Sequence, residues 1–197
     1  GVLRPYLLTE EERQKAPAGF QTAPAKGPQA EGLFYALQIS NLDCTSCGSC
    51  ASVCPAKEKA LVMRPAHEVS TDQAPWTYGL TLPERADIFD VHTVKGSQFK
   101  RPLCEFSGAC AGCGETPYAK LLTQLFGDKI YWANATGCSQ AWGSPMPSFP
   151  YTVNQEGHGP AWSNSLFENN AEFSLGMALA VKQQRQQVRR QLERLLE

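Results

Sequence analysis

The sequence carries almost no net charge, and it lacks a long apolar run. Its 18 basic and 19 acidic residues leave a formal charge of −1, so electrostatics favours neither nucleic acid nor an anionic membrane as a partner. No apolar run approaches the ~20 residues that a membrane-spanning helix needs. The first residues, Gly1 to Pro5, lack the charged start and the apolar core of a signal peptide. These absences predict a chain that binds neither membranes nor nucleic acid.

Histidine is scarce, whereas cysteine is abundant. The three histidines stand apart from one another, and we expect surface or packing positions for them. The eight cysteines fall mostly into tight clusters, at Cys44, Cys47, Cys50, Cys54, Cys104, Cys110, Cys113 and Cys138. A secreted disulfide scaffold would space its cysteines through a smaller, loop-rich chain. The clustering therefore favours metal ligation in a reducing, cytoplasmic compartment.

The densest cluster has the spacing of an iron–sulfur loop. Residues 44–55 are CTSCGSCASVCP, a C-x2-C-x2-C-x3-C-P pattern, and this pattern is typical of [4Fe–4S] binding. Small residues in the gaps let the loop curl around a cubane and direct amide N–H groups at its sulfurs, and Pro55 turns the chain away after the last cysteine. Free core thiols and a zinc site are the alternatives, although zinc usually takes two separated cysteine pairs.

A second cysteine pair, Cys110 and Cys113, lies in a loop rich in glycine and alanine. Small residues there let a bulky cofactor approach the backbone. Thr116 as the N-terminal cap and Pro117 in the first turn predict the start of a helix, which we expect to end at Gly127. The helix places one apolar stripe on a single face, formed by Tyr118, Leu121, Leu122, Leu125 and Phe126. Glu115 precedes the helix, either as a site residue or as a solvated carboxylate favoured by the helix dipole.

The segment after this helix continues with a strand and then a loop, an order of elements that is typical of an α/β domain. Residues 129–134 (KIYWAN) predict a buried strand, and a polar loop containing Gly137 and Cys138 follows it. Ligands collect at the carboxyl ends of the strands in such sheets. Cys138 is thus placed to join Cys110 and Cys113 around a ligand, and the alternative is a buried structural thiol.

The remaining segments predict further elements. Thr9 and Glu12 form a capping box at the start of a short helix. Residues 33–40 and 60–63 fit two short strands that bracket the first cysteine loop, as in a small ferredoxin. Residues 64–103 carry little periodic signal, and residues 140–164 predict irregular chain. Residues 165–197 predict a long helix with a basic, solvated side and an apolar side, the latter formed by Val181, Val188, Leu192 and Leu195.

Two stretches resemble one family, pyruvate:ferredoxin (flavodoxin) oxidoreductase, also called pyruvate synthase. Residues 42–63 (LDCTSCGSCASVCPAKEKALVM) resemble the second cluster motif of the family's inserted ferredoxin domain. Residues 95–120 (KGSQFKRPLCEFSGACAGCGETPYAK), together with ANATGCSQAWG and PYTVNQEGHGPAWSNSLFENNAEF, resemble the start of its second thiamine diphosphate domain. The resemblance covers nearly the whole chain. It implies an α+β ferredoxin-like cluster domain over residues 1–94, followed by the beginning of an α/β thiamine diphosphate-binding domain over residues 95–197.

The resemblance also implies roles for individual residues. Cys44, Cys47 and Cys50 would hold one [4Fe–4S] cluster, and Cys54 would reach across to a second cluster whose other ligands precede Gly1. Cys110, Cys113 and Cys138 would hold a third, proximal cluster. Glu115 and the loop at Cys138 would contact thiamine diphosphate, which binds with Mg²⁺. Cys104 matches no ligand position, so we expect a packing thiol.

Several parts of the family's pattern are missing here. The first cluster motif is absent, as are the Gly-Asp-Gly…Asn segment for the Mg²⁺-diphosphate and the domains for pyruvate and coenzyme A. We therefore expect this chain to be part of a longer polypeptide that forms a homodimer, with three clusters in the intact enzyme. That enzyme would convert pyruvate to acetyl-CoA and CO2 and pass electrons to ferredoxin or flavodoxin. The alternatives are a stand-alone iron–sulfur electron carrier, a natural short form or split gene, and the NADP-linked fusion form of the same enzyme.

Overall fold

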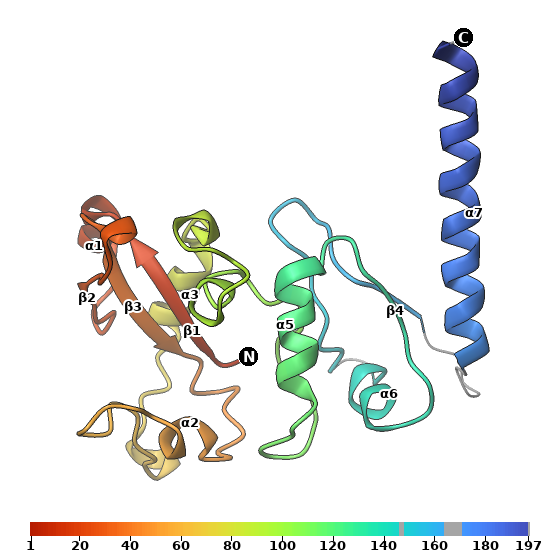
Figure 1. The fold of residues 1–197 in the computed structure, drawn as a ribbon. Coiled ribbons are helices and arrows are strands. Elements are labelled where there is room, and N and C mark those ends of the chain that lie inside the picture. The colour runs from red at the N-terminus through yellow and green to blue at the C-terminus, as the bar shows by residue number, and fades with distance from the viewer. Residues whose placement is uncertain (146–147, 164–170, 197) are drawn as a thin grey trace.

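The computed structural model describes residues 1–145, 148–163 and 171–196. Figure 1 shows a sheet-containing N-terminal part, a second part built around α5 (Thr116–Phe126) and α6 (Cys138–Gly143), and the long helix α7 (Ala171–Leu196) beside the second part. The two parts meet through the N-terminal strand and the segment that leads into α5. Within the described residues, no helix is both long enough and apolar enough to cross a bilayer.

The first part is organised by an antiparallel three-stranded sheet in the order β1-β3-β2. Strand β1 (Leu3–Leu8) pairs along its whole length with β3 (Phe34–Ile39), and the short β2 (Ala23–Pro24) pairs with the start of β3. Strand β3 confirms the strand expected over residues 33–40. Helix α1 (Glu10–Lys15) begins with the expected capping box, because Thr9 Oγ accepts from the Glu12 amide and the Glu12 carboxylate accepts from the Thr9 amide.

Short helices complete this first part, and one of them, α3, packs against β3. They are α2 (Ser49–Ser52), α3 (Ala74–Thr81), α4 (Val94–Ser97), and 3₁₀ turns at Pro28–Ala30, Ala66–Glu68 and Ala86–Ile88. Prolines set the limits of α3, since Pro75 occupies its first turn and Pro83 follows its end. The core beneath α3 is formed by Leu8, Phe20, Ala36 and Leu82.

The second part packs α5 (Thr116–Phe126) and α6 (Cys138–Gly143) around an aromatic core. Strands β4 (Tyr131–Ala133) and β5 (Ala161–Ser163) pair in parallel beside them, and α7 spans Ala171–Leu196. The buried core residues are Cys104, Ala119, Trp142 and Tyr151, and Trp132, Phe149 and Trp162 pack against them. Helix α5 ends at the expected C-terminal cap, Gly127, but the expected N-terminal cap is wrong: Glu115 is the cap, and Thr116 is already the first residue of the helix.

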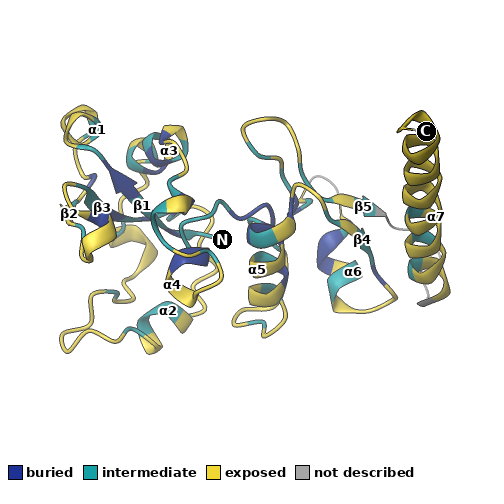
Figure 2. Cartoon of the chain, turned by 45° about the horizontal axis from the view of Figure 1, so that its top comes forward, coloured by how far each residue is buried: buried dark blue, intermediate teal, exposed yellow. Residues whose placement is uncertain are grey.

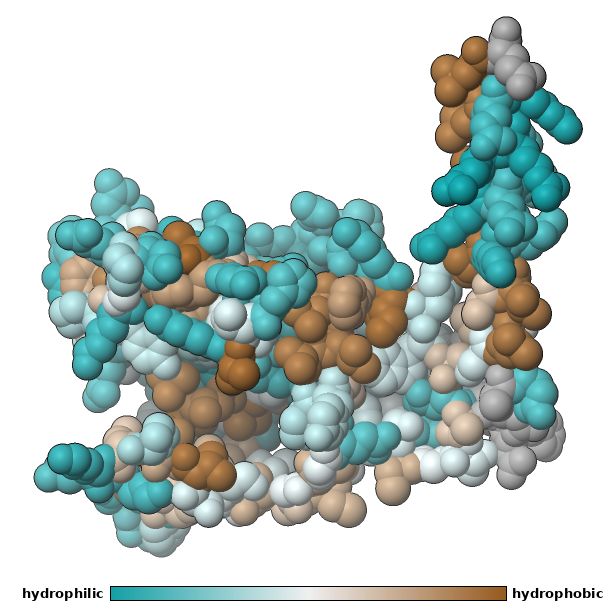
Figure 3. Space-filling model, in the orientation of Figure 1, coloured by the Kyte–Doolittle hydropathy of each residue, from teal (hydrophilic) through white to brown (hydrophobic). Residues whose placement is uncertain are grey.

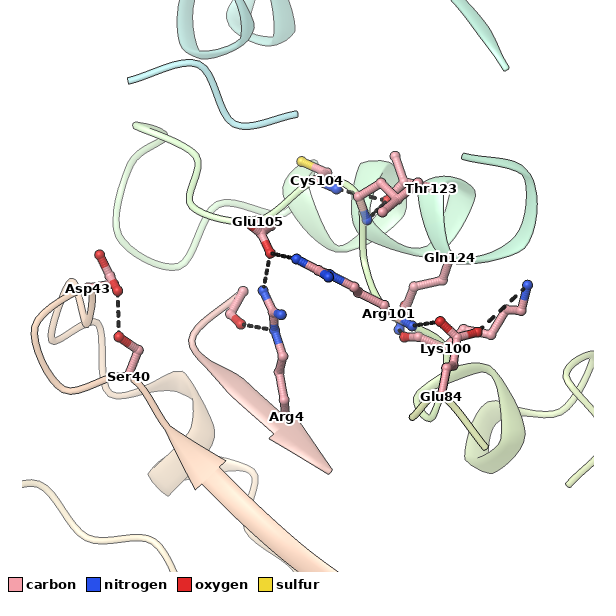
Figure 4. A network of polar contacts seen from close by, with 12 residues as sticks. Arg4, Ser40, Asp43, Glu84, Lys100, Arg101, Cys104, Glu105, Thr123 and Gln124 are labelled. Atoms are coloured by element: carbon pink, nitrogen blue, oxygen red, sulfur yellow. Dashed lines mark hydrogen bonds and ion pairs between the residues drawn. The ribbon is translucent and has the colours of Figure 1, made fainter. Parts of the chain in front are cut away.

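The buried face of α5 differs from the expected one. Its apolar stripe lies at the surface, with Tyr118, Leu121, Leu122 and Phe126 all exposed, and it forms an apolar patch in Figure 3. The residues that α5 buries are Ala119, Thr123 and Gln124. Hydrogen bonds explain why this polar face of α5 is the buried one: the Thr123 hydroxyl accepts hydrogen bonds from the amides of Leu103 and Cys104, at 3.2 and 3.0 Å (Figure 4).

Three other expectations about strands and helices need correction. Strand β4 is shorter than residues 129–134 and is not buried, since Tyr131 is 62% exposed. Residues 60–63 form no strand; the amides of Ala60 and Leu61 instead face the Cys54 sulfur. The irregular segment expected over 140–164 contains the end of α6 and β5.

Helix α7 confirms a long C-terminal helix from Ala171 onward, and the start expected between 165 and 170 falls outside the described residues. Its expected apolar side is mainly solvent-exposed, with Val188, Leu192 and Leu195 at the surface. Figure 2 shows this helix exposed along nearly its whole length, in contrast to the buried segments of β1 and β3.

Candidate metal centres

The first cysteine loop is anchored where it leaves the sheet. Strand β3 ends at Ile39, and the next residue, Ser40, is fully buried. The Ser40 hydroxyl donates to the Asp43 carboxylate (Figure 4), and the Asn41 side-chain amide donates to the Ser70 carbonyl at 2.9 Å. These contacts fix the base of the loop immediately before Cys44.

The loop itself is open to solvent and tightly curved. Ser46 and Gly48 both have left-handed backbones, with φ of 55° and 75°, and the single turn of α2 follows. Cys44 and Cys47 are exposed, whereas Cys50 and Cys54 are half-buried. At the far end, Lys59 Nζ donates to the carbonyls of Ser52 and Cys54, at 3.0 and 2.9 Å.

Hydrogen bonds at two of these sulfurs favour the thiolate. The pKa of Cys47 lies below its ordinary value because the Ser49 hydroxyl and amide face the sulfur, with a smaller contribution from the Gly112 amide. The pKa of Cys54 is lowered mainly by the amides of Ala56 and Leu61. A thiolate is the form that binds iron, so both sulfurs are predisposed to metal ligation.

The second cysteine loop has the same character. The Cys113 amide donates to the Cys110 carbonyl at 3.0 Å, and Gly112 between them is left-handed with φ of 71°. Cys110 is exposed and Cys113 is half-buried. The Glu115 amide donates to the Cys113 sulfur at 3.4 Å, and this amide and that of Thr116 lower the pKa of Cys113.

Glu115 is held by a tryptophan from the same helix as Cys138. Glu115 is the N-terminal cap of α5, and its carboxylate accepts from Trp142 Nε1 at 3.3 Å. Trp142 is buried in the aromatic core, one helical turn after Cys138 on α6. Glu115 is therefore hydrogen-bonded rather than merely solvated. Cys138 is exposed, so the alternative of a buried structural thiol is wrong.

The two cysteine loops lie side by side, although a long stretch of sequence separates them. The Gly112 amide faces the Cys47 sulfur, and a Cβ placed on Gly112 would lie 3.6 Å from the Ser49 hydroxyl. Sequence analysis missed this contact, together with the role of Trp142 under Glu115. The only sequence signal for Trp142 is its position four residues after Cys138 on a helix.

The cysteine sulfurs and the amides around them have the chemistry that an iron–sulfur cluster needs. Soft thiolates select iron–sulfur clusters, zinc and copper(I), and the amide N–H groups near Cys47, Cys54 and Cys113 supply the hydrogen bonds that such sulfurs accept. Across the described ranges, no three His, Cys, Asp or Glu side chains converge closely enough to hold a metal ion. The ligand sets Cys44, Cys47, Cys50 and Cys54, and Cys110, Cys113 and Cys138, therefore stay predictions.

Comparison with known proteins identifies the first loop and the chain around it. Residues 37–57 match the family model described as a 4Fe-4S binding domain. The whole chain is 55% identical to a "Pyruvate:ferredoxin oxidoreductase" of Moorella thermoacetica, of which it covers 17%. The chain is a homologue of one segment of the pyruvate:ferredoxin (flavodoxin) oxidoreductases. Across 91% of its length it is 58% identical to a "Pyruvate-flavodoxin oxidoreductase" of Enterobacter agglomerans, of which it covers 15%.

A third relative of the chain carries a different name. Over 95% of its length, the chain is 51% identical to a "Pyruvate dehydrogenase [NADP(+)]" of Cryptosporidium parvum, of which it covers 10%. The chain thus spans between about a tenth and a sixth of these three relatives. The resemblance inferred from the cysteine loops is confirmed, and with it the presence of a [4Fe–4S] domain.

Proposed function

We propose that this chain conducts electrons inside an oxidoreductase that converts pyruvate to acetyl-CoA and CO2. The observation that carries the proposal is the contact between the two cysteine loops, in a chain that matches a pyruvate:ferredoxin oxidoreductase over its whole length. Electrons leaving a site near Glu115 would meet the loop of Cys110 and Cys113 first and the loop of Cys47 next. Ferredoxin or flavodoxin would be the final acceptor.

Seven of the eight cysteines have a role in this proposal. Cys44, Cys47 and Cys50 hold one [4Fe–4S] cluster, and Cys54 ligates a second one. The ligands of a third are Cys110, Cys113 and Cys138. When bound, the clusters supply one-electron transfer. The chain's own residues provide the thiolates and direct amides at them, which stabilises the negative charge of a reduced centre.

The second part of the chain would belong to a thiamine diphosphate domain beginning at residue 95, after the cluster domain of residues 1–94. Helix α4 crosses this boundary. Glu115 would touch the thiamine, which binds with Mg²⁺ and supplies the carbanion chemistry of decarboxylation. Trp142 holds the Glu115 carboxylate at 3.3 Å, so that this carboxylate stays at the start of α5. Pyruvate, coenzyme A, a homodimeric assembly, the remainder of the polypeptide and a cytoplasmic location complete the proposal.

Anaerobic reconstitution tests the cluster assignment directly. The chain, supplied with iron and sulfide, should develop a broad absorbance near 400 nm that bleaches in air. Cys47→Ala should lower the iron content, whereas Cys104→Ala should leave it unchanged because Cys104 is buried in the aromatic core and belongs to neither predicted ligand set. Binding of zinc without that absorbance would refute the assignment, and circular dichroism checks that both variants fold.

A further experiment concerns Cys138 in the intact polypeptide. Cys138→Ala should spare pyruvate binding but reduce electron delivery to ferredoxin. Unchanged ferredoxin reduction would remove Cys138 from the ligand set. Cys104→Ala, which removes a thiol outside the predicted ligand sets, is the matched control and should retain electron delivery.

One alternative acceptor has specific support. The 51% identity to the NADP-named relative of Cryptosporidium parvum makes a flavin-linked, NADP-reducing fusion form the second candidate. The intact polypeptide should reduce ferredoxin or flavodoxin and not NADP⁺; the opposite result would favour the fusion form. A native polypeptide in cell extracts no larger than this chain, with iron but no pyruvate oxidation, would favour a stand-alone electron carrier.

A further inference from the structure

Arg4 is a charged side chain buried between the two parts of the molecule. It belongs to β1, an edge strand of the sheet, yet its side chain is only 6% exposed. Arg4 Nη2 donates to the Glu105 carboxylate at 2.7 Å, as Figure 4 shows. Arginine is seldom buried to this extent unless it is paired. The pair links the sheet of the first part to the segment that leads into the second cysteine loop.

The guanidinium of Arg4 also lies against aromatic rings from both parts. Its central carbon is 4.9 Å from the ring centroid of Trp76 on α3 and 6.0 Å from that of Phe106. The two rings lie 6.2 Å apart. Because Trp76 is buried and Phe106 is half-buried, the attraction between the cation and the rings is little weakened by water. Arg4 thus holds a ring of the first part beside a ring of the second.

On its first-part side, this contact is joined to the base of the first cysteine loop. Trp76 lies in the first turn of α3, and the residue that caps this helix, Gln73, accepts from the Ser40 hydroxyl at 3.3 Å. The amide of Ser40 donates to the carbonyl of Val2 at 2.9 Å. Ser40 is therefore fixed both by α3 and by the chain that carries Arg4.

On its second-part side, the contact is joined to the base of the second cysteine loop. Glu105 and Phe106 are consecutive, and Cys110 follows shortly after them. The Glu105 amide donates to the Pro150 carbonyl at 2.8 Å, which ties this segment to the aromatic core. The second loop thus departs from a backbone position that Arg4 holds from one side and Pro150 from the other.

We propose that Arg4 is a positioning residue that sets the separation of the two cysteine loops, and through it the rate of electron transfer between the centres they hold. This inference rests on the proposed function, since it requires that both loops hold clusters. Electron transfer slows steeply as donor and acceptor move apart, so a small shift of either loop has a large effect. A planar guanidinium suits this role because it can bond a carboxylate at its edge while its faces lie against rings.

Arg4→Lys in the intact polypeptide tests the proposal, and Arg85→Lys is its matched control. A lysine keeps the charge beside Glu105 but lacks the flat group that contacts two rings. Arg85 bonds the Glu12 carboxylate and the Leu7 carbonyl, both at 2.8 Å and both in the first part. In the reduced polypeptide, the magnetic interaction between clusters, recorded by electron paramagnetic resonance, should weaken in Arg4→Lys alone. Ferredoxin reduction should slow several-fold in that variant, with the iron content unchanged.

Hydrogen exchange of the iron-free chain gives a second readout that does not depend on clusters. The amides of Ser40 and Glu105 are hydrogen-bonded at the bases of the two loops. Arg4→Lys should speed exchange in peptides that contain them, whereas Arg85→Lys should not. Phe106→Leu keeps the ion pair of Arg4 and removes only one ring, so it should shift both readouts in the same direction by a smaller amount.

The outcomes separate this inference from the proposed function. If clusters assemble and interact equally in Arg4→Lys and Arg85→Lys, the role of Arg4 is overturned and the proposed function stands. Equal exchange at Ser40 and Glu105 in the two variants would overturn that role as well. An unsubstituted polypeptide without absorbance near 400 nm would overturn the proposed function and this inference together. If circular dichroism shows that Arg4→Lys does not fold, the comparison of Phe106→Leu with Arg85→Lys decides in its place.

Discussion

Glu105 and Glu10 each pair with an arginine at 2.7 Å, but burial separates their contributions to stability. The Arg4 and Glu105 side chains are 6% and 19% exposed, whereas those of Arg13 and Glu10 are 43% and 46% exposed. Removing one partner of a buried ion pair leaves an uncompensated charge, which lowers the free energy of unfolding by about 3 kcal/mol or more. We therefore expect Glu105→Gln to lower the free energy of unfolding by about 3 kcal/mol, measured by urea denaturation.

Glu10→Gln is the matched control for this prediction. Its loss should be far smaller, because water screens the exposed pair. Equal losses in the two variants would show that burial of the Arg4–Glu105 pair contributes nothing. The Arg4–Glu105 pairing across the molecule was not predictable from the sequence, since charge composition does not tell which carboxylate lies beside Arg4.

Cys104 is a thiol with a raised pKa, in contrast to Cys47, Cys54 and Cys113 in the two loops, whose pKa values are lowered. It is 2% exposed, and burial raises its pKa to about 11. The unfolded thiol ionises near pH 9, so between pH 9 and 11 the unfolded state loses a proton that the folded state keeps. The stability that the neutral thiol contributes is therefore fully present below pH 9 and is lost as the pH rises toward 11. At about 1.36 kcal/mol per pKa unit, the free energy of unfolding falls by about 2–3 kcal/mol over this range.

The Cys104→Ala variant measures this effect. Its stability should fall less steeply than that of the unsubstituted chain between pH 9 and 11, in urea titrations at fixed pH. Tyr151 contributes an alkaline loss of its own in both proteins, because burial raises its pKa too, so the difference between the two curves is the quantity to compare. Parallel curves would contradict the assigned pKa. The packing role expected for Cys104 agrees with its place among Ala119, Trp142 and Tyr151.

At the scale of elements, α5 shows what periodicity can and cannot predict. Pro117 and Gly127 located its two ends, because caps and turns depend on local chemistry, although the N-terminal cap is Glu115 and not the expected Thr116. The stripe of Leu121, Leu122 and their neighbours identified an apolar face, but periodicity does not tell whether a described element covers it. The strand expected over 60–63 does not form for a related reason: the amides of this segment face the Cys54 sulfur instead of pairing with a neighbouring strand.

The face that α5 does bury leads to a prediction about Thr123. Its hydroxyl accepts from two buried amides and donates to the Lys120 carbonyl at 2.8 Å. Thr123→Val keeps the shape but leaves both amides unpaired, so we expect a loss of about 2–3 kcal/mol in the free energy of unfolding. Thr81→Val is the control, because the exposed Thr81 hydroxyl bonds only its own helix, through the Tyr78 carbonyl. A loss at Thr123 no larger than at Thr81 would contradict the anchoring role.

At the scale of the whole molecule, the sequence predicted each cysteine loop but not their meeting. The spacing of Cys44 to Cys54 is a local property that any reader of the sequence can find. The contact between Gly112 and the residues around Cys47 depends on how β1, α4 and α5 bring the two parts together. Long-range geometry of this kind has no signature in a single sequence.

This meeting of the loops can be tested through Gly112 in the intact polypeptide. Its φ of 71° is left-handed, and a β-branched side chain there would strain the backbone and crowd the Ser49 hydroxyl, which a Cβ would approach to 3.6 Å. Gly112→Val should therefore displace the loop of Cys110 and Cys113 from Cys47. The iron content should stay at about twelve per polypeptide, as expected for three cubanes, while ferredoxin reduction slows several-fold. Gly108→Val, where a Cβ meets nothing within 4 Å, should leave both quantities unchanged. Equal rates for the two variants would mean that the contact between the loops does not govern electron transfer.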